Sequence, residues 1–182
     1  YDRAYEMIDK YQPQAVVFSD GGPGCRWVGN ENGFAGATNW SFLRAGEVYP
    51  GYPKYRELQY GHADGNQWVA AECDVSIRPG WFYHPEEDNR VKTVEQLTDL
   101  YYRSVGHNAT LLLNFPVDRN GLIHPVDSAN AVDFHKNIQK QLAHNLLSGV
   151  VAEVSDERGG KYTAKAMTDN DYDTYWATND GV

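Results

Sequence analysis

The hydrophobic pattern at the start of the chain changes from a helical period to a continuous apolar run. Over residues 1–11 the apolar side chains recur every three or four positions, which predicts an amphipathic helix. Pro13 lies in the polar segment that ends it. Residues 15–18 are then apolar and lead through Ser19 to Asp20, which predicts a short buried strand over 15–20 that ends at a carboxylate followed by two glycines. Helix, short loop and strand are typical of an α/β sheet or barrel.

The same alternation returns further along the chain. Residues 21–65 are rich in glycine and aromatic residues without a sustained period, so we expect long loops there. Asn120 and Gly121 predict a turn within residues 116–125. The remaining elements predicted are strands at 68–76 and 109–114, a helix at 94–105, and a helix at 128–147 with Ser128 as its N-cap and Gly149 just beyond its end.

Repeated strands that end in polar residues, with helices between them, form the unit of a (β/α)8 barrel. The chemistry of such barrels lies at the C-terminal ends of the strands. A complete barrel takes about 250 residues, and about half of one fits before Gly149. We therefore predict an α/β fold in which residues 1–148 are the C-terminal part of a catalytic (β/α)8 TIM barrel, without its first strands.

Composition and charge exclude several classes of function. The chain has 182 residues, of which 41% are hydrophobic, as expected of a folded protein. Sixteen Lys and Arg stand against 25 Asp and Glu, giving a net charge of -9 without a basic cluster, so nucleic acid is not an expected partner. The sequence has no apolar run of about 18 residues, so no membrane-spanning helix is predicted. Cys25 and Cys73 make neither a disulfide framework nor a zinc site, and they either pair or stay free.

Two carboxylates are candidates for glycoside hydrolysis. Asp20 follows a predicted strand and precedes two glycines, which places it at the mouth of a barrel; the plainer interpretation is an Asp that caps a turn. Glu72 lies in the strand at 68–76, where period two puts it on one face with Trp68 and Asp74. A retaining glycosidase needs two carboxyl groups about 5 to 5.5 Å apart. The cross-strand pair of Asp20 and Glu72 suits this geometry better than Glu72 with Asp74.

Three long segments carry a resemblance to a known family. The segments are VFSDGGPGCRWVGNE at 17–31, ECDVSIRPGWFYH at 72–84 and SVGHNATLLLNFP at 104–116. In this order they resemble glycoside hydrolase family 29, the α-L-fucosidases, over roughly residues 1–147. The second segment looks like the acid/base region of the subfamily that cuts α-1,3- and α-1,4-linked fucose from Lewis-type glycans.

This resemblance implies roles for six residues. Asp20 matches the nucleophile and Glu72 the acid/base of a retaining mechanism that needs no cofactor. The implied substrate contacts are Trp68, Arg78, Trp81 and Glu31. Each of these four has an alternative, since the tryptophans also suit a core, Arg78 an ion pair and Glu31 a loop. His84 is a further candidate for a substrate contact, because it stands close to Trp81 and Tyr83 in the sequence. The segment between Asp20 and Glu72 is longer than in some relatives.

The tail changes in character. Residues 149–182 are interpreted as a linker and the start of a second domain, because the segment AKAMTDNDYDTYW at 164–176 resembles the opening of a galactose-binding-like β-sandwich. Asp169, Asp171 and Asp173 also mimic the start of an EF-hand loop, but Thr174 stands where glycine is required. A structural calcium ion in this second domain is the one metal that the residues suggest.

The expected partners are fucosylated oligosaccharides or glycoconjugates, and the expected location is secreted or periplasmic in a bacterium, as the family implies. The alternative function is a carbohydrate-binding module without catalysis, in which the 13 Tyr and five Trp bind sugar and the carboxylates only fix loops.

Overall fold

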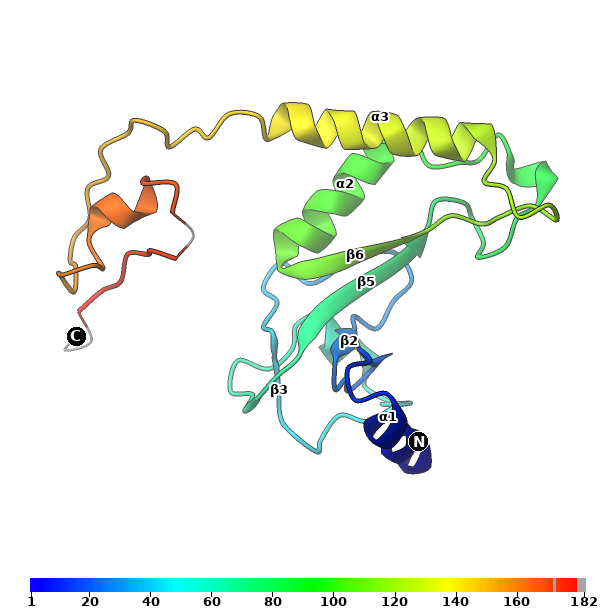
Figure 1. The fold of residues 1–182 in the computed structure, drawn as a ribbon, viewed down its shortest axis with the longest axis horizontal. Helices are drawn as coiled ribbons and strands as arrows, with labels where there is room; N and C mark the ends of the chain where they lie inside the picture. The colour runs from blue at the N-terminus through cyan, green and yellow to red at the C-terminus, as the bar shows by residue number, and fades with distance from the viewer. Residues whose placement is uncertain (172, 180–182) are drawn as a thin grey trace. The chain divides into compact units, whose positions relative to one another are not determined.

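A parallel sheet organises the first part of the chain, and its strands are drawn as arrows in Figure 1. The computed structural model describes residues 1–171 and 173–179. The strands lie in the order β1-β2-β5-β6. Their bounds are β1 Phe18–Ser19, β2 Cys25–Trp27, β5 Ala70–Ser76 and β6 Ala109–Asn114. A separate antiparallel ribbon joins β3 (Phe42–Leu43) to β4 (Gln67–Trp68).

In the described part of the chain three α-helices accompany the strands, namely α1 Asp2–Tyr11, α2 Val94–Ser104 and α3 Pro125–Gln141. Short 3-10 helices lie at η1 Tyr55–Gln59, η2 Pro85–Glu87, η3 Val105–His107 and η4 Ala164–Met167. The start of α2 is fixed by a capping box, in which Thr93 and Gln96 exchange side-chain and backbone hydrogen bonds. Among the described residues, no helix is long and apolar enough to cross a membrane.

The core lies between the sheet and α2. Along β5, Ala71, Cys73 and Val75 are buried, and Val75 packs in one cluster with Leu97 and Leu100 of α2. The alternate residues of β5 therefore point to the opposite side, which we call the open face of the sheet. Burying a side chain such as Leu97, which is 0% exposed, contributes about 1.5–3 kcal/mol.

Arg26 points to the buried face and is fully enclosed. Its guanidinium donates to the carbonyl oxygens of Trp40, Leu58 and Val69 and to the side chain of Asn39. Burial lowers the pKa of Arg26 to about 10. Arg26 therefore ties the loop before β3, the helix η1 and the residue before β5 to β2, an organising role that the hydrophobic pattern does not predict.

The predicted α/β fold with a parallel sheet is confirmed, but several element bounds were wrong. The strand predicted at 15–20 shortens to β1. Phe18 is 38% exposed, because β1 is an edge strand of the sheet, with β2 as its neighbour on one side. The strand predicted at 109–114 is only partly buried, since β6 is the other edge. The loop predicted at 21–65 holds β2 and β3. The last helix begins at Pro125, which suits a first helical position, and ends at Gln141.

The chain divides into two units, Tyr1–Ile138 and Gln139–Val182. The described part of the second unit holds the last residues of α3, then η4 and turns, and no strand is formed among its described residues. Tyr172 and residues 180–182 of the predicted second domain lie outside the described residues. The boundary near residue 148 and the β-sandwich stay predictions.

Candidate active site

Asp20 comes directly after β1, and its carboxylate is held by backbone donors. The N–H groups of Gly51 and Tyr52 donate to Oδ2 at 2.6 and 3.1 Å. In the turn around Asp20, the Ser19 hydroxyl donates to the Gly22 carbonyl at 2.7 Å, and the Tyr5 hydroxyl of α1 donates to the same oxygen at 3.2 Å. The turn after β1 is thus fixed on both sides of Asp20.

Glu72 lies on the open face of β5, as period two predicts. The thiol of Cys25, on the neighbouring strand β2, donates to Glu72 Oε2 at 3.7 Å. Burial, and then the charge and hydrogen bond of Glu72, raise the pKa of the Cys25 thiol to about 11. Cys25 is therefore a thiol at neutral pH and serves as a donor to the carboxylate. Both cysteines are free.

The strand register brings Asp20 and Glu72 to one level of the sheet. Ser19 pairs with Arg26, and Trp27 pairs with Glu72, so Asp20 continues β1 at the level of Trp27. Neighbouring strands lie about 4.8 Å apart, so the backbones of β1 and β5 are roughly 10 Å apart. Two side chains that extend over the shared face can close most of that distance.

Asp74 is a third carboxylate on the open face, one pleat beyond Glu72. The Trp27 indole Nε1–H donates to Asp74 Oδ1 at 2.7 Å. Burial raises the pKa of Asp74, the Trp27 hydrogen bond opposes this, and the charge of Glu31 adds to it. The Asp74 carboxylate on β5, bound to Trp27 on β2, is therefore partly withdrawn from water.

Glu31 and Trp81 meet over the ends of β2 and β5. The Trp81 indole donates to Glu31 Oε2 at 2.9 Å. Both line a cavity of about 580 Å3 that extends toward α2, where Glu95, Gln96 and Leu100 also line it. Neither Asp20 nor Glu72 is among its lining residues. The structure therefore brings these two candidates together at the carboxyl ends of the strands, where barrel enzymes place their chemistry.

Trp68 and His84 lie apart from the two carboxylates. Trp68 is 63% exposed on β4, where it pairs with Phe42. It precedes Glu72 by four residues, about 13 Å along an extended chain. His84 is exposed before η2. Among the described residues, neither side chain makes a hydrogen bond or ring contact to Asp20 or Glu72.

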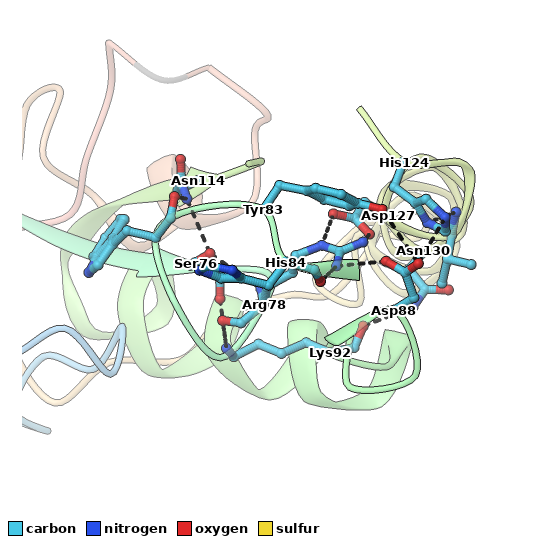
Figure 2. Close-up of polar contacts among 12 residues, drawn as sticks. Ser76, Arg78, Tyr83, His84, Asp88, Lys92, Asn114, His124, Asp127 and Asn130 are labelled. Carbon is cyan, nitrogen blue, oxygen red and sulfur yellow. Dashed lines mark hydrogen bonds and ion pairs between the residues drawn. The ribbon is translucent and has the colours of Figure 1, made fainter. Parts of the chain in front are cut away.

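Arg78 lies inside the protein and is surrounded by carboxylates, as Figure 2 shows. Its guanidinium makes a bidentate pair with Asp127 at 2.7 and 2.8 Å and donates to Asp88 at 2.9 Å. A further bond reaches the His84 carbonyl at 3.3 Å, and the ring of Tyr83 lies 4.7 Å away. The hydrogen bonds and charges of the two carboxylates raise the pKa of Arg78. These contacts tie the loop after β5 to the start of α3.

Two more side chains, Lys92 just before α2 and Asn114 at the end of β6, fix the end of β5 and the loop after it (Figure 2). Lys92 Nζ donates to the Ser76 carbonyl at 2.6 Å, and burial lowers the pKa of Lys92. Asn114, at the end of β6, donates to Ser76 Oγ and to the Trp81 carbonyl, both at 3.1 Å. The backbone that carries Trp81 is thus held by polar groups on β5 and β6.

Sequence reasoning missed the residues that hold the site. Asp127 is not predicted, because the predicted helix starts at Ser128, whereas α3 begins at Pro125 and carries Asp127 in its first turn, a usual pattern for the start of a helix. The donors from Gly51 and Tyr52 lie 31 and 32 residues beyond Asp20, and no local sequence pattern relates them to it.

The tail holds no arranged metal site in its described residues. No group of three or more His, Cys, Asp and Glu side chains in residues 1–171 and 173–179 is placed to hold a metal ion. Asp169 accepts hydrogen bonds from the Asp171 N–H and the Thr174 hydroxyl, as in an Asx turn. The structural calcium ion stays a prediction.

The chain resembles known fucosidases over almost its whole length. No protein-family model matches it. Alpha-L-fucosidase 1 of Arabidopsis thaliana is 39% identical over 97% of the chain. A Bacteroides thetaiotaomicron structure assigned as an α-L-fucosidase superposes with a TM-score of 0.90 and 42% identity over all of the chain. A Ruminococcus gnavus GH29 fucosidase solved with fucose superposes over 87% of it, with a TM-score of 0.75 and 37% identity.

The similarity covers one segment of these longer proteins. The chain spans 35% of the Arabidopsis protein, 40% of the Bacteroides chain and 32% of the Ruminococcus chain. The match in sequence and the match in fold agree over the same residues. The chain therefore belongs to glycoside hydrolase family 29, the α-L-fucosidases.

Proposed function

We propose that the protein is a retaining α-L-fucosidase, with Asp20 as nucleophile and Glu72 as acid/base. The observation that carries this proposal is the register, which puts the two carboxylates at one level of the sheet. Asp20 presents a carboxylate with one oxygen already held by two N–H groups. The R. gnavus relative was solved with fucose, which supports fucose as the sugar.

The mechanism has two displacements. Asp20 attacks the anomeric carbon of fucose, the glycosidic C–O bond breaks, and Glu72 gives its proton to the leaving oxygen. Glu72 then takes a proton from water, which attacks the fucosyl-enzyme ester and frees Asp20. The Cys25 thiol is a donor that orients Glu72 without competing for its charge at neutral pH.

Trp81 and Glu31 are proposed to contact the sugar through the family resemblance, supported by the hydrogen bond that joins their side chains beyond the ends of β2 and β5. Trp68 stays a proposed contact through the family resemblance alone, and His84 through its place in the sequence beside Trp81 and Tyr83. For Arg78 we favour a positioning role, since its guanidinium is 0% exposed and bound to two carboxylates. This role is compatible with activity, because Arg78 fixes the loop that carries Trp81.

The finer assignments rest on the resemblance of residues 72–84. We propose that the substrate is α-1,3- or α-1,4-linked fucose of Lewis-type glycans. We also propose that the sheet is part of a (β/α)8 barrel followed by a β-sandwich, and that the protein acts in the periplasm or outside a bacterial cell. The Arabidopsis relative shows that the family also occurs in plants.

Release of fucose by the intact protein tests the activity. We expect release from a Lewis-type trisaccharide and none from a linear α-1,2-fucosylated sugar. Asp20→Asn and Glu72→Gln should each abolish release while the circular dichroism spectrum is unchanged. Asp133→Asn, a change of an exposed carboxylate on α3, is the matched control and should keep full activity. Sugar binding without any release would favour the binding module.

A further inference from the structure

The loop between β3 and η1 turns back onto the carboxylate after β1. Its turn at Pro50 and Gly51 presents two successive N–H groups, from Gly51 and Tyr52, to Asp20. Both bonds reach Oδ2, and among the described residues no donor reaches Oδ1. The carboxylate therefore has one oxygen fixed by the protein and the other open.

The conformation of this turn depends on Gly51. Its φ of +83° lies in the left-handed region, which costs little for glycine and more for a residue with a Cβ. Successive N–H groups in such a turn form a concave site for an anion. A Cβ on Gly51 would meet no atom within 4 Å, so a substitution there perturbs the backbone conformation without a clash.

Three contacts hold the turn against Asp20. A Cβ on Gly21 would lie 2.6 Å from the Val48 carbonyl oxygen, so the missing side chain lets the loop approach. The Tyr52 hydroxyl donates to Glu57 of η1 at 3.0 Å. This bond lowers the pKa of Glu57. The rings of Tyr49 and Tyr52 meet edge to face at 5.9 Å. The turn is thus anchored independently of Asp20.

We propose that the turn at Gly51 is a positioning element for the nucleophile: its two N–H groups bind Asp20 Oδ2 and so select Oδ1 as the oxygen that attacks the anomeric carbon. This inference rests on the proposed function of Asp20. The two donors keep the carboxylate from rotating, and they stabilise its negative charge before the sugar binds. The long segment between Asp20 and Glu72 thereby acquires a role in catalysis.

Matched glycine variants of the intact protein test the proposal. Gly51→Ala should lower kcat/KM for 4-nitrophenyl α-L-fucoside by about 10- to 100-fold, since small misplacements of reacting groups have effects of this size. The loss should fall on kcat rather than KM. Gly51→Asn should lose less, because Asn tolerates positive φ better than Ala. Gly46→Ala is the control, since Gly46 has φ +79° in the same loop, open space around it and no contact with Asp20.

Azide rescue distinguishes positioning from a general effect on the fold. In Asp20→Gly, added azide attacks the anomeric carbon in place of the carboxylate, releases nitrophenolate and gives fucosyl azide. In this background Gly51→Ala should have no further effect, because no carboxylate remains to be held. If Gly51→Ala lowers activity equally with Asp20 present and in Asp20→Gly with azide, or does not lower it with Asp20 present, the positioning role of the turn is wrong while Asp20 can still be the nucleophile. If azide restores nothing to Asp20→Gly, Asp20 is not the nucleophile and both proposals fail.

Discussion

Removing the Asp127 carboxylate is the sharpest test of how the loop after β5 is held. Arg78 and Asp127 are both 0% exposed in their side chains, and their closest pair of atoms is 2.7 Å apart. Asp127→Ala leaves the guanidinium buried with Asp88 as its remaining acidic partner. Breaking a buried pair on one side costs about 3–5 kcal/mol. With a urea dependence of about 2 kcal/mol per molar, the unfolding midpoint should fall by roughly 2 M.

The assay is urea unfolding of the intact protein, followed by circular dichroism. Asp133→Ala on the same helix is the control, because Asp133 and Lys136 are 62% and 68% exposed and such pairs contribute about 0–1 kcal/mol. Arg78→Met with Asp127→Leu should recover part of the loss, since no unpaired charge remains. A loss below about 1 kcal/mol for Asp127→Ala would refute the reasoning.

Three further changes test the core, the thiols and a turn. Leu97→Ala should lower the free energy of unfolding by about 2–5 kcal/mol, and a loss near zero in urea unfolding would contradict the core assignment. Burial raises the pKa of Cys25 to about 11 and of Cys73 to about 12. The folded state thus keeps protons that the unfolded state releases above about pH 9. The contribution of the two thiols to the free energy of unfolding should therefore be steady below pH 9 and fall as the pH rises toward 11. A free energy of unfolding that rises over this range would contradict this, and so would the same fall in a variant with both cysteines replaced by Ala. Gly29→Ala should lower the melting temperature far more than Gly121→Ala, because both have φ +77° but only a Cβ on Gly29 would meet the Tyr55 carbonyl; equal effects would count against that contact.

The sequence predicts elements where the hydrophobic period is unambiguous. The helix over 94–105 and the strand over 109–114 appear as α2 and β6, because Leu97 and Leu100 pack on the sheet with the period that identified them. β2 could not be predicted, because three residues within a loop have no period of their own. It becomes a strand only through pairing with β1 and β5.

The sequence likewise predicts some residues of the candidate site and not the contacts that surround others. Glu72 was placed on one face with Asp74 by period two, and the structure puts both on the open face of β5. Arg78 was an expected sugar contact or ion-pair partner, and its surroundings depend on Asp127, which is 49 residues away in sequence. Contacts at such separation are set by how the chain folds back on itself, which a local pattern does not encode.

Identification of the residue that becomes fucosylated tests the central claim most directly. The intact protein would be treated with 2-deoxy-2-fluoro-α-L-fucosyl fluoride, whose fluorine slows hydrolysis of the ester, and then digested and analysed by tandem mass spectrometry. The account predicts one fluorofucosyl group, carried by Asp20 and absent in Asp20→Asn. A label on Asp74 or Glu31, or an active enzyme that accumulates no label, would contradict it.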